Sequence, residues 1–190
     1  LSLILREPIG VVGQIVPWNF PFLMAAWKLA PVLAAGDVTI LKPSSSTSLS
    51  VLELMKLIQN VVPKGVINLI TGKGSKSGEF LQHNTGLDKL AFTGSTEVGR
   101  EIGLSAAQMI IPSTLELGGK SANVFFKDAD MKVALEGIQL GILFNQGQVC
   151  SAGSRIFVEE SFYDEFMAHV IPAFQKVKVG NPLDMNTQMG

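Results

Sequence analysis

Short apolar segments typical of β-strands alternate along this chain with segments of helical periodicity. The expected strands are Gly10–Val16, Val38–Leu41, Ile67–Ile70, Lys89–Phe92 and Ser113–Leu117. The helices expected between them are Phe22–Ala35, Ser48–Val62, Lys76–His83 and Thr96–Leu104. This alternation predicts an α/β fold with a doubly wound parallel sheet, covered by helices on both faces and binding its ligand at the carboxyl ends of the strands.

Two residues predict details of these helices. Pro31 lies inside the first one and predicts a kink or a break there, because proline cannot donate a helical hydrogen bond. Ser48 is placed to cap the amino terminus of the second helix.

A second unit is expected to begin after the glycine pair Gly118-Gly119. Its elements would be strand Asn123–Phe126, helix Met131–Phe144, strand Arg155–Glu159 and helix Phe162–Val177. We therefore expect one domain over residues 1–118 and the beginning of a second over residues 119–190. The chain starts in an apolar run without Met, and its mean hydropathy is +0.34, so we expect a piece of a longer protein.

Charge and cysteine content argue against several classes of function. The net charge of −1 comes from mixed signs without a basic stripe, so neither nucleic acid nor an acidic membrane is an expected partner. The two long uncharged stretches contain prolines, glycines and amides, and buried core is the better interpretation of both. A single cysteine, with no signal-peptide pattern, favours a reducing, cytoplasmic location.

Cys150, the single cysteine, follows a charge-free run rich in glycine and amides. A thiolate can attack an aldehyde, and a carboxylate such as Glu116 can later activate water against the resulting thioester. Asn19 can donate to the intermediate oxyanion, together with the backbone N–H of Cys150. In isolation, Cys150 could equally be an inert buried thiol and Glu116 a capping or salt-bridged carboxylate. The two histidines, His83 and His169, give neither a Cys–His pair nor the spacing of a metal site, and no metal ligand is predicted.

Two glycine-rich turns, Gly72–Gly78 and Phe92–Gly99, each leave a strand and enter a helix. Such turns let the backbone approach a phosphate, although ordinary strand–helix turns explain them equally well. Lys42 at a strand end could contact ribose or phosphate, or could be a solvated surface lysine. The i, i+3, i+4, i+7 series that begins at Phe20 gives one apolar helical face, which is either core or the wall of a substrate site.

Five motifs in one order together resemble the aldehyde dehydrogenase superfamily across nearly the whole chain. They are Pro17-Trp18-Asn19-Phe20-Pro21, Lys42-Pro43-Ser44, Phe92-Thr93-Gly94-Ser95-Thr96, Glu116-Leu117-Gly118-Gly119-Lys120 and Phe144-Asn145-Gln146-Gly147-Gln148-Val149-Cys150. The implied fold is this family's variant of the nucleotide-binding fold, followed by the start of its catalytic domain. The implied activity is oxidation of a small-molecule aldehyde to a carboxylic acid with NAD or NADP, in a homo-oligomer (dimer or tetramer).

The resemblance also implies a role for individual residues. Cys150 would be the nucleophile, Glu116 the general base and Asn19 the oxyanion donor. The cofactor would contact Ile15, Val16, Pro17, Trp18, Lys42, Ser45, Gly74, Gly78, Gly94, Ser95, Val98 and Leu117. The substrate would contact Phe20, Leu23, Met24, Trp27, Val149 and Ser151.

The chain departs from the family pattern in two ways. Many NAD-using members carry a glutamate where this chain has Ser45, so NADP could be accepted or preferred. The chain also lacks the family's second glutamate motif and oligomer-forming segments, and we expect these 190 residues alone to be inactive. Two alternatives stay open at this point: a CoA-acylating aldehyde dehydrogenase, whose members generally lack the base at position 116, and a non-catalytic nucleotide-binding or structural module.

Overall fold

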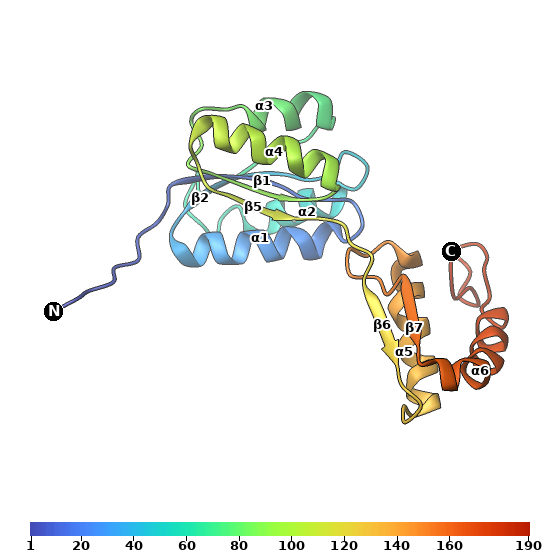
Figure 1. Cartoon of the computed structure of the whole chain (residues 1–190). Coiled ribbons are helices and arrows are strands. Elements are labelled where there is room, and N and C mark those ends of the chain that lie inside the picture. The colour runs from blue at the N-terminus through green and yellow to red at the C-terminus, as the bar shows by residue number, and fades with distance from the viewer. The chain divides into compact units, whose positions relative to one another are not determined.

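Five parallel strands form the centre of the first of two units into which the chain divides, Leu1–Leu117 and Gly118–Gly190 (Figure 1). The structure is a computed structural model that describes residues 1–190. The sheet order is β3-β2-β1-β4-β5. The strands are β1 (Val11–Ile15), β2 (Val38–Lys42), β3 (Ile67–Leu69), β4 (Lys89–Thr93) and β5 (Ser113–Glu116). All five expected strands are present.

Helices cover both faces of this sheet, which confirms the doubly wound fold (Figure 1). Helices α1 (Pro21–Ala35) and α2 (Leu49–Ile58) pack on one face, around a core of Val16, Ala25, Leu29, Leu41 and Val51. A five-residue π-helix (Gly74–Gly78) leads directly into α3 (Glu79–Gln82). Helix α3 and α4 (Thr96–Met109) share the opposite core, made of Leu81, Leu87, Leu90, Phe92, Ile102 and Ala106.

Neither the break predicted at Pro31 nor the side-chain cap predicted at Ser48 is present. Helix α1 continues through Pro31 without a break, since the face that includes Ala25, Leu29 and Val32 is buried on both sides of the proline. Ser48 occupies the N-cap position of α2, but its side chain makes no capping bond. Its backbone is already helical, with φ −79° and ψ −16°, whereas side-chain capping needs an extended residue.

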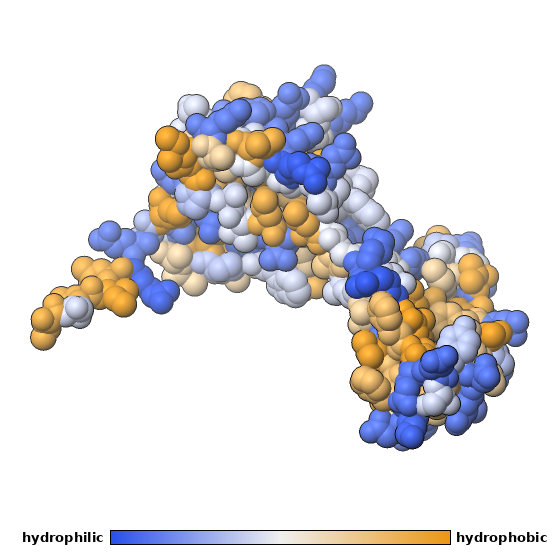
Figure 2. All heavy atoms as spheres, viewed as in Figure 1, coloured by the Kyte–Doolittle hydropathy of each residue, from blue (hydrophilic) through white to orange (hydrophobic).

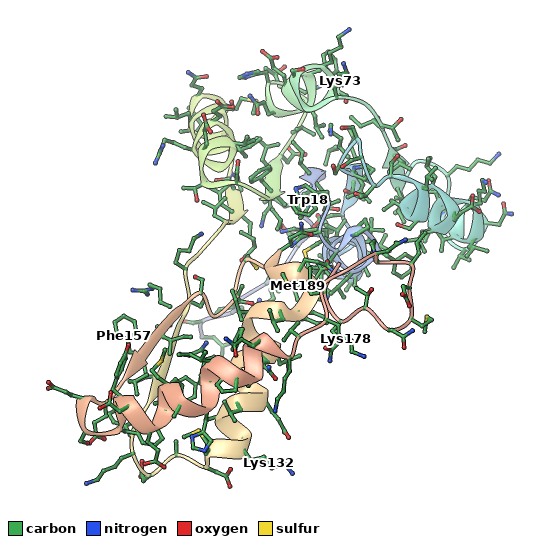
Figure 3. All side chains as sticks on the ribbon, turned by 90° about the vertical axis from the view of Figure 1, so that its right-hand side faces the viewer. Trp18, Lys73, Lys132, Phe157, Lys178 and Met189 are labelled. Atoms are coloured by element: carbon green, nitrogen blue, oxygen red, sulfur yellow. The ribbon has the colours of Figure 1, made fainter.

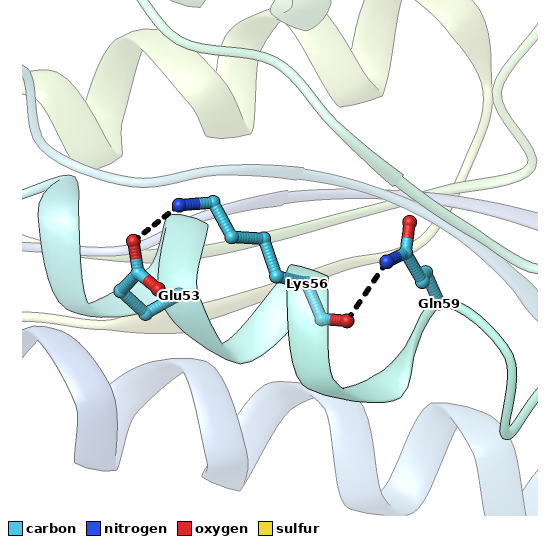
Figure 4. A network of polar contacts seen from close by, with 3 residues as sticks. All are labelled: Glu53, Lys56 and Gln59. Carbon is cyan, nitrogen blue, oxygen red and sulfur yellow. Dashed lines mark hydrogen bonds and ion pairs between the residues drawn. The ribbon is translucent and has the colours of Figure 1, made fainter.

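Helix α2 is also shorter than expected, ending at Ile58, and α4 is longer, ending at Met109. Figure 4 shows the polar contacts near the end of α2, where Lys56 Nζ lies 2.6 Å from Glu53 Oε1 and the Gln59 side chain donates to the Lys56 carbonyl at 3.0 Å. The ion pair is exposed, and pairs of this kind contribute only about 0.3–0.5 kcal/mol. The burial of Val51 is therefore the stronger attachment of α2 to the sheet.

A buried polar link joins the two central strands to helix α1. The Thr39 hydroxyl on β2 lies 3.0 Å from Gln14 Oε1 and 3.1 Å from the Val12 carbonyl on β1. The Gln14 amide then donates to the Lys28 carbonyl of α1 at 2.9 Å. Thr39 and Gln14 are both almost fully buried, so each polar atom depends on these partners rather than on water.

Replacing Thr39 with valine should lower the free energy of unfolding by about 1–3 kcal/mol, because it leaves buried acceptors without their donor while preserving shape. Urea denaturation measures the loss. Thr114→Val on β5 is the matched control, since the Thr114 hydroxyl has no hydrogen-bond partner in the protein, and it should change stability by less than about 0.5 kcal/mol. Equal effects of the two substitutions would contradict a structural role for the link.

The second unit is a parallel β–α–β arrangement followed by a further helix. Strands β6 (Ala122–Phe125) and β7 (Arg155–Val158) pair in register, and α5 (Met131–Leu143) connects them. Short 3-10 segments (Phe144–Gly147 and Glu160–Phe162) follow α5 and precede α6 (Tyr163–Gln175). The core residues are Ala134, Ile138, Phe162, Phe166 and Val170. The assignment of the two units as domains of a larger enzyme stays a prediction.

The other face of the β6–β7 pair is apolar and exposed. Val124 and Phe157 are register partners on this face, and each is at least half exposed. Figure 2 shows apolar atoms at the surface of this unit, and Figure 3 labels Phe157 on β7. The Arg155 guanidinium lies 5.4 Å from the centre of the Phe157 ring and partly covers it. None of the helices in either unit is both long and apolar enough to cross a membrane.

Candidate active site

A large cavity opens at the carboxyl ends of β1 and β2, between them and helices α3 and α4. Its volume is about 670 Å³. Five residues expected to contact a nucleotide line it: Ile15, Lys42, Gly74, Gly78 and Val98. The cavity therefore occupies the edge of the sheet where doubly wound folds bind their ligands.

Lys42 ends β2 and supplies the main positive charge of this cavity. Its side chain is buried, and Nζ donates to the Pro43 carbonyl at 3.1 Å. Burial lowers the pKa of the Lys42 ammonium. Gly78 lies close to this side chain, since a Cβ there would be 3.4 Å from Lys42 Cε. A buried cation with a single carbonyl partner is suited to an anionic or polyhydroxyl ligand. The alternative of a solvated surface lysine is wrong.

The amino terminus of α4 lies where β4 ends. Ser95 is its N-cap, and the Ser95 side chain accepts from the Val98 N–H at 3.3 Å. Free N–H groups at such a terminus favour anions. Gly99, one turn further, allows Leu117 to pack against the helix, because a Cβ at Gly99 would lie 2.3 Å from Leu117 Cδ2.

Several expected cofactor residues do not line the cavity. Val16 is buried in the core, whereas Trp18, labelled in Figure 3, is about half exposed just beyond β1. Ser45 is exposed in the turn between β2 and α2. The others outside the cavity lining are Pro17, Gly94, Ser95 and Leu117.

Eight further residues that the sequence motifs did not predict line the cavity: Ser75, Glu79, Gln82, His83, Glu101, Leu104, Ser105 and Gln108. Those on α4 follow Val98 at helical spacing, so they continue one face of that helix. This spacing was the signal that could have found them. His83 is exposed, and its ring also contacts Ser105 on α4.

Asn19 and Glu116 both lie at the carboxyl edge of the first unit's sheet. Asn19 is half-buried between β1 and α1, and Glu116 is the exposed last residue of β5. The Glu116 carbonyl accepts from the Gly94 N–H at 3.0 Å, which ties the end of β5 to the loop after β4. Burial lowers the pKa of the nearby Lys28 ammonium, and the negative charge of Glu116 partly opposes this shift.

The predicted apolar face at the start of α1 is divided between core and surface. Met24 packs against the core, whereas Leu23 and Trp27 are exposed and Phe20 is half-buried. Leu23 and Trp27 are therefore available to a ligand, and Met24 is mainly structural. Their role in substrate binding stays a prediction.

Cys150 is a free, exposed thiol in the second unit. It is therefore not the inert buried cysteine of the alternative interpretation. Backbone bonds hold the segment around it: the Ala152 N–H donates to the Val149 carbonyl and the Gly153 N–H to the Gly141 carbonyl. An apolar cavity of about 360 Å³ adjoins Cys150 and includes the two flanking residues expected to contact substrate, Val149 and Ser151. The complete lining is Leu140, Gly141, Phe144, Val149, Ser151 and Ala152.

Three consecutive residues before Cys150 have a left-handed backbone. They are Asn145, Gln146 and Gly147, with φ values of 50°, 57° and 71°. Non-glycine residues seldom adopt this conformation, and such strain is concentrated at functional sites. Only glycine fits the third position, because a Cβ on Gly147 would also lie 2.9 Å from the Ile142 carbonyl.

Replacing Gly147 with alanine should lower the free energy of unfolding by about 1–3 kcal/mol, owing to left-handed strain and this close contact. The matched control is Gly137→Ala in the exposed part of α5, where a Cβ meets nothing within 4 Å. This control should be neutral or stabilising by up to about 1 kcal/mol. Denaturant unfolding measures the free energy of unfolding of both variants. A Gly147→Ala variant as stable as Gly137→Ala would contradict strain in this turn.

Comparison with known proteins identifies the family. A family model described as the aldehyde dehydrogenase family matches residues 1–190. The chain belongs to the aldehyde dehydrogenase family. It is 53% identical to an aldehyde dehydrogenase of Vibrio cholerae serotype O1, over 98% of this chain and 38% of that protein.

Solved structures of aldehyde dehydrogenases have the same fold. Betaine aldehyde dehydrogenase from Staphylococcus aureus in complex with NAD+ is 45% identical, with a TM-score of 0.93 over 97% of this chain and 37% of that one. An NAD+ complex of aldehyde dehydrogenase from Bacillus cereus is 44% identical, with a TM-score of 0.93, and the match covers 97% of this chain and 38% of that one. The chain thus spans less than two-fifths of the length of these relatives.

Proposed function

We propose that the protein carrying this chain oxidises an aldehyde to a carboxylic acid with NAD(P)+ as hydride acceptor and water as co-substrate. The observation that carries this proposal is the match to the aldehyde dehydrogenase family over residues 1–190 in a chain that keeps Cys150, Glu116 and Asn19. Two of the solved relatives were determined with NAD+, which supports NAD+ as the first cofactor to test.

The residues of the large cavity fit a dinucleotide. Lys42 offers a buried ammonium for ribose or phosphate oxygens. The amino terminus of α4 offers N–H groups for a phosphate; its cap Ser95 lies outside the cavity lining, but Val98 in its first turn belongs to the lining. Gly74 leaves open space, because a Cβ there would meet nothing within 4 Å. When bound, the oxidised nicotinamide ring supplies the hydride acceptor for the reaction.

The chemistry assigned to this chain begins at Cys150. Its thiolate attacks the aldehyde carbon, and the S–C bond forms as the carbonyl electrons move to oxygen. The Asn19 amide and the Cys150 backbone N–H stabilise that oxyanion. A bound NAD(P)+ would accept the hydride that leaves the carbonyl carbon as the C=O bond re-forms, and Cys150 would then hold the acyl group as a thioester.

Hydrolysis then releases the product. Glu116 takes a proton from water, the hydroxide oxygen attacks the thioester carbon, and the C–S bond breaks to regenerate the thiolate. The exposed carboxylate at the end of β5 is accessible to the water that this step needs. The presence of Glu116 argues for water as the acceptor and against the CoA-acylating alternative, whose members generally lack a base at this position.

Changes at Cys150 and Glu116 should separate the two halves of the reaction. Cys150→Ala should abolish aldehyde oxidation while nucleotide still binds, because only the nucleophile is lost. Glu116→Gln should leave a rapid burst of NAD(P)H followed by turnover slowed at least tenfold, because acylation precedes the step that needs the base. Stopped-flow absorbance and nucleotide titration measure both effects.

Two results would count against these assignments. Wild-type rates in both variants would remove Cys150 and Glu116 from the mechanism. Faster turnover with free CoA, yielding acyl-CoA, would replace hydrolysis with acyl transfer. His169→Asn on the exposed part of α6 is the control, since this side chain contacts only the Glu165 carbonyl of its own helix.

We further propose that the Ser45 turn admits NADP+ as well as NAD+. Ser45 is exposed directly after β2, and the neighbouring hydroxyls of Ser44 and Ser46 lie 3.0 Å apart. The turn contains no carboxylate that would repel a 2′-phosphate, and its hydroxyls can donate to one.

Ser45→Glu should lower kcat/KM for NADP+ at least tenfold while preserving or raising kcat/KM for NAD+, because the added carboxylate repels a 2′-phosphate. Steady-state kinetics with both cofactors give the ratio. Ser46→Glu places the same charge one residue further along the turn. It should change the ratio of kcat/KM for NADP+ to kcat/KM for NAD+ less than Ser45→Glu does. An unchanged ratio in Ser45→Glu, or equal changes in the two variants, would refute the assignment.

The aldehyde itself is proposed only by class. Phe20, Leu23, Trp27 and the apolar cavity beside Val149 and Ser151 favour an aldehyde with an apolar or medium-sized carbon chain. We also propose a homo-oligomer, a dimer or tetramer, for the whole protein, following the family resemblance.

A further inference from the structure

His83 bridges the two helices that form the walls of the nucleotide cavity. Its Nδ1 lies 3.3 Å from Ser105 Oγ on α4, and its Nε2 lies 3.1 Å from the Gln82 side-chain nitrogen at the end of α3. All three residues line the cavity. The imidazole ring thus has one partner on each side of the groove.

The donor and acceptor roles of the two partners decide which ring nitrogen of His83 carries the proton and which nitrogen bonds across to α4. The Gln82 amide nitrogen is a donor, so Nε2 of His83 accepts and the ring proton is on Nδ1. Nδ1–H then donates to the Ser105 hydroxyl. Because Gln82 adjoins His83 in sequence, only the Nδ1 bond crosses from α3 to α4. Ser105 is 3% exposed, so its hydroxyl depends on a protein partner.

The bond lies just beyond the carboxyl end of α3, next to the apolar contact between α3 and α4. Leu81 on α3 and Ile102 and Ala106 on α4 share one core, but α3 has only four residues. Such a short helix contributes little stability of its own. A polar contact just beyond its end therefore restrains its distance from α4.

We propose that His83, through its Nδ1 bond to Ser105, is a positioning residue that sets the width of the nucleotide cavity between α3 and α4. This inference rests on the proposed use of that cavity for NAD(P)+. Glu79, Glu101 and Lys42 are the other titratable groups lining the cavity, and the hydrogen-bond partners of the His83 ring are Gln82 and Ser105 instead.

Two isosteric replacements separate the two ring nitrogens. The asparagine amide nitrogen occupies nearly the position of Nδ1, and the glutamine amide nitrogen nearly that of Nε2. His83→Asn should therefore keep the bond to Ser105, whereas His83→Gln should lose it. Ser105→Ala removes the same bond from the α4 side.

In the full-length protein, His83→Gln and Ser105→Ala should each raise KM for the dinucleotide about three- to tenfold, as expected for one lost hydrogen bond. The aldehyde KM and kcat should stay near wild-type values. His83→Asn should keep the dinucleotide KM within about twofold of wild type. The double variant His83→Gln/Ser105→Ala should have a dinucleotide KM no higher than that of either single variant, because the two substitutions remove the same hydrogen bond. His169→Gln is the matched histidine control.

Equal KM values for His83→Asn and His83→Gln, or additive effects in the double variant, would overturn the proposal. Amide hydrogen exchange over Glu79–Gln82 gives a second readout that needs no turnover. Exchange there should be faster in His83→Gln and Ser105→Ala but not in His83→Asn, and equal exchange in all three would also overturn it. Absence of NAD(P)+-dependent aldehyde oxidation in the wild type would instead reject the proposed function, leaving the exchange result to decide the role of His83.

Discussion

The parallel pairing of β1 with its two neighbours is the constraint on which the rest of the first unit depends. Because β1 pairs with both β2 and β4, the segments that follow all three strands leave from the same edge of the sheet. Asn19 and Ser95 lie in the segments after β1 and β4, and Lys42 is the last residue of β2 at the same edge. The Thr39–Gln14–Lys28 link stabilises this arrangement from within, since it joins β2, β1 and α1 through buried polar atoms. A one-residue slip between β1 and β2 would break the link and turn Thr39 to the other face.

The strands could be predicted from sequence because parallel strands covered on both faces are short, apolar runs ended by glycine or polar residues. Details that depend on tertiary context could not. Local rules predict a break at Pro31, but the buried face of α1 outweighs the one missing hydrogen bond. Serine is a common helix cap, but the backbone of Ser48 does not have the extended conformation that side-chain capping needs. The turn closed by the bond from the Thr47 N–H to the Ser44 carbonyl leads into Ser48.

The same distinction applies to the site. Lys42, Gly74, Gly78 and Val98 could be found because they follow strands or fall in motifs, where the chemistry is local. His83 and Ser105 could not, since their relation exists only when α3 packs beside α4. The sequence could identify Cys150 as a lone thiol but not establish its exposure, on which its reactivity depends.

The left-handed segment 145–147 shows how the second unit presents this thiol. Helix α5 ends at Leu143, and an ordinary helical continuation would carry the chain onward along the helix axis. The left-handed residues turn the chain away from the helix axis. After Cys150, the hydrogen bond from the Gly153 N–H to the Gly141 carbonyl attaches the chain to α5 again. Cys150 therefore lies in a loop fixed at both ends, exposed beside an apolar cavity. Backbone strain of this kind persists only where the surrounding packing enforces it, here through a turn whose third position accepts only glycine.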